Sequence, residues 1–171
     1  MIPQEIDIEA LARQLQADNV AADDGVRTTW GDEAQGKLEE FRQTLNNGDD
    51  PRAADKIGET KLVLLDNPDL TLENSRDVAQ ALKTRTDADT VIVQSTRSPG
   101  VVSDTLTRYN IENNQFQMAG SLNPQSTTNF IEHSAAADHH AGLVNATLLI
   151  LVFVAIAITA ASVWLVRQLR A

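Results

Sequence analysis

The sequence predicts an α/β domain that is followed by one membrane-spanning helix. Residues 62–65 and 90–95 are short segments rich in apolar side chains, a pattern typical of strands that are covered on both faces of a sheet. A helical pattern lies between them, and a strand, a helix and a strand within about 35 residues form a βαβ unit with parallel strands. Further along the chain, residues 143–166 carry no charged side chain.

The first predicted element is an amphipathic helix that begins after Asp7. An aspartate at this position can accept hydrogen bonds from the free amide groups of the first helical turn. Apolar side chains then recur at helical spacing, with polar side chains on the opposite side. The apolar stripe consists of Ile8, Leu11, Ala12 and Leu15.

Residues 18–60 are predicted to hold a short strand, a helix and a loop. Residues 26–30, VRTTW, favour an edge strand within a polar stretch. Residues 32–45 repeat the helical pattern, and an Asn-Asn-Gly sequence ends that helix. Residues 46–60 are rich in turn-forming residues and hold few apolar groups, so we expect a loop there.

The βαβ unit follows, and Asp66, Asn67 and Pro68 end its first strand. Asn74 is the expected N-cap of the crossover helix, and Asp77 favours a helix N-terminus nearby. A further helical stretch is predicted to start at Ser103. Its pattern includes Leu106, Tyr109, Asn113 and Phe116. A last amphipathic segment at 127–136 carries Phe130 and Ile131.

The segment at 143–166 has the properties of a single membrane-spanning helix. Its 24 residues, at about 1.5 Å each, rise roughly 36 Å, enough to cross a hydrocarbon core of about 30 Å. A tryptophan and two arginines at its end suit the headgroup region. The residues that mark this anchor are Leu143, Trp164, Val166, Arg167 and Arg170. The predicted organisation is therefore a soluble domain at 1–136, a linker at 137–142, the span, and a basic tail at 167–171.

Two arguments disagree on the side of the membrane that the domain occupies. The tail has two arginines and the roughly twenty residues before the span have no Lys or Arg, so the positive-inside rule places the C-terminus in the cytoplasm. Against this, residues 1–20 contain no basic segment followed by an apolar one, so no secretory signal is expected. The second argument favours a cytoplasmic domain, and both orientations are kept.

The charge balance excludes one class of partner. All 24 acidic residues and 12 of the 14 basic residues precede the span, which gives that part of the chain a formal charge of −12. Binding to a nucleic-acid backbone needs clustered Lys and Arg, so no nucleic-acid partner is expected. Without cysteine, the chain can form no disulfide and no Cys-ligated metal site.

The order of these segments resembles that of a known family. LVLLDNPDLTLENSRDVAQALKTRTDADTVIVQSTRSPGVVSDTLTRYNIENNQ, then NFIEH and one C-terminal span, is similar to an uncharacterised family of small actinobacterial single-pass membrane proteins. That family distantly resembles a truncated TPM-type α/β domain, with residues 34–60 as an apparent insertion. The resemblance implies an α/β sheet, a membrane location and a role around the cell envelope, near peptidoglycan-remodelling machinery. It supplies no catalytic residues, because no catalytic set of TPM relatives matches here.

Four carboxylates follow the first buried strand, at the edge where open α/β sheets bind ligands. They are Asp66, Asp69, Glu73 and Asp77. Together they could bind a divalent cation, the one cofactor considered. Turn formation by Asp66-Asn67-Pro68 and the preference of helix N-termini for acids explain the same residues without a metal. The segment LVLLDNPDLT also resembles aspartate-nucleophile phosphatases, but its second Asp is one position too far along.

Two weaker patterns lie near the predicted span. The three histidines and two neighbouring acids could bind zinc or sense pH, although their spacing fits no helix-face motif and a solvated linker explains them. These residues are His133, His139, His140, Glu132 and Asp138. Ala157 and Ala161 form a small-xxx-small pair that could support a homodimer.

The sequence therefore leaves two functions open. The first is a membrane-anchored, non-enzymatic interaction module whose partners are the bilayer and a membrane or envelope protein. The second is a metal-dependent, phosphatase-like hydrolase that uses the four carboxylates after the first buried strand.

Overall fold

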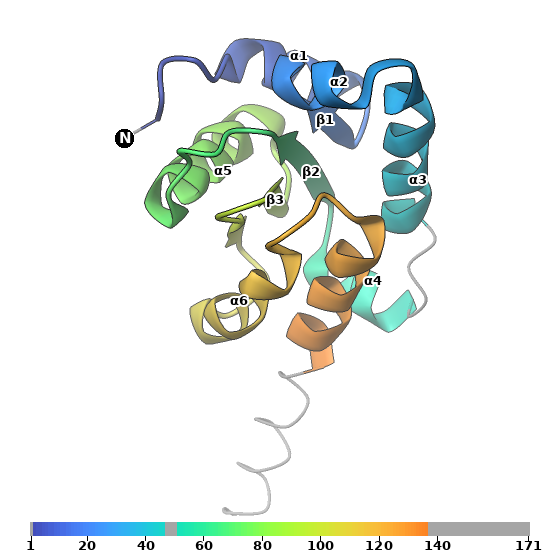
Figure 1. The fold of residues 1–171 in the computed structure, drawn as a ribbon. Helices are drawn as coiled ribbons and strands as arrows, with labels where there is room; N and C mark the ends of the chain where they lie inside the picture. Colours follow the sequence, from blue (N-terminus) through green and yellow to red (C-terminus); the bar gives the residue numbers. More distant parts are fainter. Residues whose placement is uncertain (1, 47–50, 137–171) are drawn as a thin grey trace, which may run out of the picture. The chain divides into compact units, whose positions relative to one another are not determined.

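A four-stranded mixed sheet lies at the centre of residues 2–46 and 51–136, the part of the chain that the computed structural model describes (Figure 1). Its strands lie in the order β1 (Val20–Ala22), β2 (Thr60–Leu65), β3 (Thr90–Ser95) and β4 (Gly100–Ser103). The first three strands are parallel, and β4 runs antiparallel to β3. The predicted α/β class and the parallel βαβ pair are confirmed.

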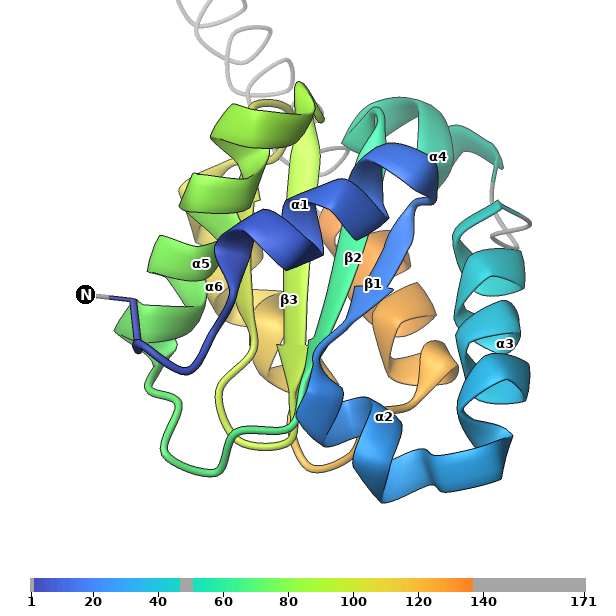
Figure 2. The ribbon, with the colours of Figure 1, turned by 90° about the horizontal axis from the view of Figure 1, so that it is seen from above.

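Helices cover both faces of the sheet, with α1 in front of the strands in Figure 2. Before the crossover the helices are α1 (Ile8–Ala17), α2 (Asp24–Trp30), the 3-10 helix η1 (Gly31–Glu33), α3 (Ala34–Asn46) and α4 (Pro51–Ile57). After it come α5 (Leu72–Thr86), α6 (Arg108–Asn114), the 3-10 helix η2 (Gln115–Met118) and a last helix at 124–136.

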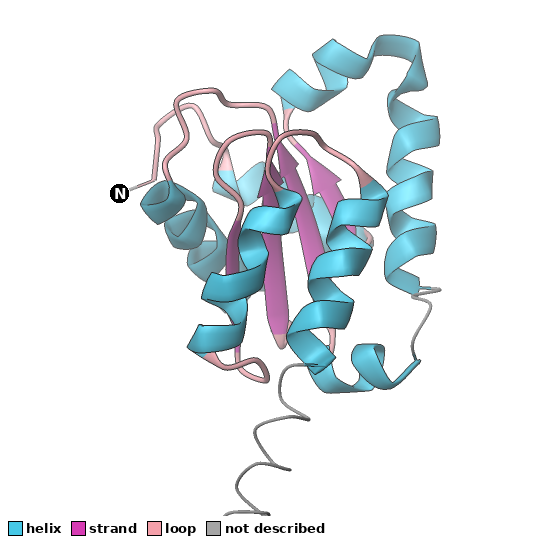
Figure 3. Ribbon diagram, turned by 60° about the horizontal axis from the view of Figure 1, so that its bottom comes forward, coloured by secondary structure: helices cyan, strands magenta, loops and turns pink. Residues whose placement is uncertain are grey.

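Alternate residues of the buried strands point to opposite faces, as the pleat requires. On one face, Val63 and Val93 pack against α1 and α5. On the other, Leu62 and Ile92 belong to the apolar cluster beneath the helices that lie in front of the strands in Figure 3. The chain therefore has three layers, with a hydrophobic core on each side of the sheet.

The predicted edge strand at 26–30 is wrong. These residues belong to helix α2, because the Asp23 side chain accepts a hydrogen bond from the Val26 amide at 2.8 Å and caps the helix. The strand that pairs with β2 comes earlier, at Val20–Ala22, where three buried residues give too short a pattern to predict.

The predicted loop at 46–60 is also wrong for its second half. Pro51 opens helix α4, a position where its missing amide hydrogen costs no helical bond. Ala53 and Ile57 of this helix are buried, so the segment contributes to the core. Residues 47–50 lie outside the described residues.

Two predicted helix starts are displaced. The crossover helix is capped by Thr71 and not by Asn74, which instead completes a capping box with Thr71. Ser103 ends strand β4, and the following helix α6 begins after its N-cap, Thr107. The helices predicted after Asp7 and at 32–45 are present, the second as η1 and α3.

Gln94 in the central strand β3 positions the last helix. Its side-chain amide donates to the carbonyl oxygens of Ser121 and Asn123 and to the hydroxyl of Ser126, at 3.3, 3.2 and 2.8 Å. Its oxygen accepts from the Thr127 hydroxyl at 2.8 Å. Phe130, which follows, is fully buried. The predicted amphipathic helix at 127–136 is thus confirmed and begins slightly earlier.

The predicted linker at 137–142, the span at 143–166 and the tail at 167–171 lie outside the described residues. None of the helices in residues 2–46 and 51–136 has the length and apolar character that a membrane crossing needs.

Candidate functional site: an acidic pocket at the carboxyl ends of β1 and β2

A pocket of about 410 Å³ opens where strands β1 and β2 end. We call it the acidic pocket, because five carboxylates and no Lys or Arg line it. The carboxylates are Glu5, Asp7, Asp23, Asp24 and Asp66. Apolar atoms of Ile6, Leu11 and Ala22, which are buried, form part of the wall. The pocket therefore combines negative charge with apolar surface at the sheet edge where α/β folds commonly bind ligands.

Asp23 holds this edge together because β1 passes directly into α2 there (Figure 2). Its amide donates to the Leu64 carbonyl oxygen at 3.1 Å, which continues the pairing of β1 with β2. Its carboxylate caps α2 and also accepts a hydrogen bond from the Asp66 amide at 3.3 Å. One side chain thus links the ends of both strands.

Burial raises the pKa of the Asp23 carboxyl group above its ordinary value, and the nearby carboxylates of Asp66 and Asp24 raise it further. The hydrogen bonds from the amides of Val26 and Asp66 act in the opposite direction and are outweighed. The negative form of Asp23 is therefore under-compensated, a state that a bound cation would relieve.

Asp66, at the end of β2, accepts a hydrogen bond from the Thr29 hydroxyl at 2.7 Å. Next to it, the Asn67 side chain donates to Glu5 at 3.1 Å. These two bonds draw α2 and the N-terminal segment toward the end of β2. They give the acidic pocket walls from three separate parts of the chain.

The free edge of β1 is closed by the side chain of Gln14. Its amide donates to the Ala22 carbonyl oxygen at 3.3 Å and its oxygen accepts from the Ala22 amide at 3.2 Å. Arg27 adds a 2.6 Å hydrogen bond to the same Gln14 oxygen. The guanidinium group of Arg27 therefore binds Gln14 and does not line the acidic pocket.

The four carboxylates predicted as a metal site are divided by the structure. Asp66 lines the acidic pocket. Asp69 is exposed in the turn, where its amide donates to the Asn67 side chain at 2.9 Å. Glu73 and Asp77 line a different pocket, of about 560 Å³, beside helix α5. Across residues 2–46 and 51–136, no three His, Asp or Glu side chains are grouped so that they could hold a metal ion.

The second pocket has mixed charge. Arg76 and Arg108 line it together with the two acids of α5. Both arginines reach Glu112, at 3.8 and 2.7 Å. Hydrogen bonding to Arg108 lowers the pKa of the Glu112 carboxyl group. The arginines therefore have an anionic partner within the domain.

The predicted histidine cluster falls mostly outside the described residues, as do Asp138 and the anchor residues. His133 lies on the last helix, exposed, with Nδ1 at 2.8 Å from the Gln117 side-chain oxygen. Glu132 beside it is half-buried.

The sequence identified only one of the five pocket carboxylates, Asp66. Asp23 and Asp24 were missed because the strand that precedes them was not recognised, and Glu5 and Asp7 join the pocket from the N-terminal segment through contacts distant in sequence. Two acids directly after the apolar triplet VAA at 20–22 were the available signal.

A comparison with known families places the chain. The family model described as "Membrane protein Rv1476" matches residues 1–171. No curated protein and no solved structure compared with the chain gives a significant match. The membrane-protein resemblance predicted from the sequence is thus confirmed at the level of this family. Because the match spans the full length, the chain belongs to the Rv1476 membrane protein family.

Proposed function

We propose that the protein is a membrane-anchored, non-enzymatic interaction module that binds a basic segment of another membrane or envelope protein. The observation that supports this function is the acidic pocket, which pairs five carboxylates with an apolar wall. Its volume of about 410 Å³ lies within the range of roughly 300–1,000 Å³ that ligand pockets have.

The chemistry of the acidic pocket matches a Lys or Arg side chain. Such a side chain can lay its aliphatic stem on the apolar wall formed by Ile6 and Leu11 while its charged end meets the carboxylates. A cation beside Asp23 would also offset the burial of its carboxylate and the repulsion from Asp66 and Asp24.

The predicted anchor at 143–166 would add to this affinity. A tether that holds the domain near the bilayer raises the effective concentration of the acidic pocket around other membrane proteins. We also propose that the protein acts around the cell envelope and that its domain is related to TPM-type domains. The proposal takes the domain to lie on the cytoplasmic side of the membrane.

The proposal is tested with the full-length chain in lipid nanodiscs and a fluorescent tetralysine peptide as the probe. Asp23→Asn together with Asp66→Asn should weaken binding, measured by fluorescence anisotropy, by about tenfold at low salt. The control removes two charges elsewhere, with Glu40→Gln on α3 and Asp87→Asn after α5, both exposed positions. A loss of similar size in both double variants would show general charge attraction and refute a pocket-specific function.

The hydrolase alternative gives a different result. If Mg²⁺, Ca²⁺ or Mn²⁺ raises the melting temperature of the full-length chain and Asp66→Asn abolishes the rise, a metal site at Asp66 is supported. A peptide that binds without any metal effect supports the interaction module.

A further inference from the structure

We infer that Tyr109 and Phe116 form a lipid-contacting surface that rests on the headgroup region of the membrane. We call these two residues the aromatic pair. The inference rests on the proposed membrane tether, and it adds which side of the domain faces the bilayer.

The aromatic pair is exposed while its neighbours are buried. Tyr109 on α6 is 73% exposed and Phe116 on η2 is 58% exposed, the large apolar side chains left open in the described residues. Ile111 and Met118 from the same helices are buried in the core. The helices are therefore correctly packed, and the aromatic pair is on their outer side.

The chain leaves the described domain next to α6 and η2. The Asn110 side chain donates to the Ser134 carbonyl oxygen at 3.3 Å, and Gln117 contacts His133 at 2.8 Å. Six residues, and so seven Cα-to-Cα steps, separate position 136 from Leu143, where the uncharged segment begins. An extended chain spans at most about 3.6 Å per residue, so this tether reaches at most about 25 Å. The start of the predicted span can therefore lie no farther than that from the end of the last helix.

The charge around the aromatic pair permits contact with a bilayer. Residues 105–136 contain one basic residue, Arg108, and two acidic residues, Glu112 and Glu132, and Arg108 forms an ion pair with Glu112 at 2.7 Å. The preceding 104 residues carry 21 acidic and 11 basic residues. A bilayer with anionic lipids repels that excess far more than a segment with a net charge of −1.

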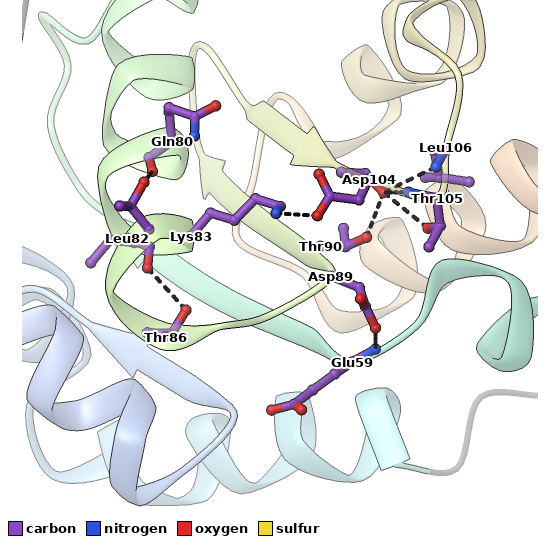
Figure 4. Close-up of polar contacts among 12 residues, drawn as sticks. Glu59, Gln80, Leu82, Lys83, Thr86, Asp89, Thr90, Asp104, Thr105 and Leu106 are labelled. Atoms are coloured by element: carbon purple, nitrogen blue, oxygen red, sulfur yellow. Dashed lines mark hydrogen bonds and ion pairs between the residues drawn. The ribbon is translucent and has the colours of Figure 1, made fainter.

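Two acids near the start of the parallel strands, Glu59 and Asp104, form ion pairs. Lys83 contacts Asp104 at 2.5 Å, and Lys61 contacts Glu59 at 3.1 Å; the first pair is drawn in Figure 4. The acidic pocket lies at the other ends of the strands, beyond Ala22 and Leu65. Contact through the aromatic pair therefore leaves the acidic pocket away from the headgroups.

The side chains of Tyr and Phe are suited to the headgroup region of a membrane. Aromatic side chains are enriched where proteins meet the membrane interface, and a tyrosine hydroxyl can remain hydrated while its ring is buried.

The sequence offers a clean probe, because Tyr109 is the only tyrosine. The full-length chain is labelled with 3-fluorotyrosine and placed in phosphatidylcholine–phosphatidylglycerol vesicles that contain a gadolinium-chelating lipid. Line broadening in ¹⁹F NMR then reports how close position 109 is to the headgroups. A second sample with 5-fluorotryptophan reports on Trp30, at the end of α2, and on Trp164 of the predicted anchor, assigned with Trp30→Phe and Trp164→Phe.

We expect the gadolinium lipid to broaden Tyr109 and Trp164 strongly and Trp30 weakly. Phe116→Ser should reduce the broadening at Tyr109 at least twofold, and the matched control Gln125→Ser, exposed on the last helix, should not. If Trp164 is broadened but Tyr109 is not, the inference is wrong and the tether stands. If Trp164 is not broadened, the tether itself fails. Changes at Tyr109 that follow protein concentration and not the gadolinium lipid would indicate a second copy of the chain and overturn the lipid contact.

Discussion

The two faces of the sheet are covered in different ways. On one face, α1 and α5, with 10 and 15 residues, pack on alternate strand residues through an apolar cluster. On the other face, helices from distant parts of the chain meet, and buried polar groups such as Gln94 and Asn110 join them. The two buried side-chain atoms that lack a partner in the described residues, Gln115 Oε1 and Ser134 Oγ, also belong to the helices α6, η2 and 124–136. The first face depends on apolar area, whereas the second also depends on hydrogen-bond geometry.

The largest expected effects test whether both faces are equally part of the core. Phe130→Ala on the second face should lower the free energy of unfolding by about 3–5 kcal/mol, and Leu82→Ala on the first by about 2–5 kcal/mol, since both side chains are fully buried. Chemical denaturation measures both. A Phe130 variant that loses less than about 1 kcal/mol would mean that the last helix is not packed as described.

The next prediction isolates the polar bonds of the second face. Gln94→Leu keeps the side-chain size but leaves the carbonyl oxygens of Ser121 and Asn123 without their donor, so stability should fall by about 2–3 kcal/mol. Thr127→Val removes one bond to Gln94, and a double-mutant cycle with both changes should show coupling. Additive effects, or a stabilised Gln94→Leu variant, would contradict the role of this network.

A smaller effect is expected at the helix cap of the first face. Thr71→Ala removes the side chain that caps α5 and should cost about 1 kcal/mol. Glu73→Gln, an exposed change in the first turn of the same helix, is the control and should cost less. Equal losses would show that charge near the helix N-terminus, and not the cap, stabilises α5.

The smallest effect concerns the cap of α2, which packs on the second face. Asn at position 23 can still cap the helix but carries no charge. Because burial raises the pKa of Asp23 in the folded chain, its negative form disfavours folding at neutral pH, and this cost disappears as the pH falls toward the ordinary aspartate pKa of about 3.9. Asp23→Asn should therefore melt at a higher temperature than the native chain at pH 7. The difference should vanish near pH 3. A variant that is less stable at pH 7 would show that the carboxylate is stabilising.

The same comparison explains what the sequence could predict. On the first face, apolar periodicity predicted α1 and the βαβ unit, although α5 is capped by Thr71 and not by Asn74. The same periodicity predicted α3 and the last helix on the second face. On the second face, α2 and α4 have seven residues each, and their burial depends on partners far along the chain. A seven-residue segment contains too little periodicity to distinguish a helix from a loop or strand.

The acidic pocket was only partly predictable for a related reason. Asp66 was identified because its strand is continuously apolar and ends in a turn. Asp23 and Asp24 join it only when the three-residue strand β1 is placed beside β2. Glu73 and Asp77 were grouped with Asp66 by their closeness in sequence, but helix α5 carries them to the other pocket.

The carboxamide of Gln14 protects the edge strand β1 from pairing with another chain. An open edge strand is a template on which another molecule can extend the sheet and begin to aggregate. Gln14 occupies both outward-pointing backbone groups of Ala22, as a neighbouring strand would. Copies of a membrane protein meet often, because they diffuse in one plane. To add a strand at β1, a second copy would first have to displace the Gln14 side chain from the backbone of Ala22.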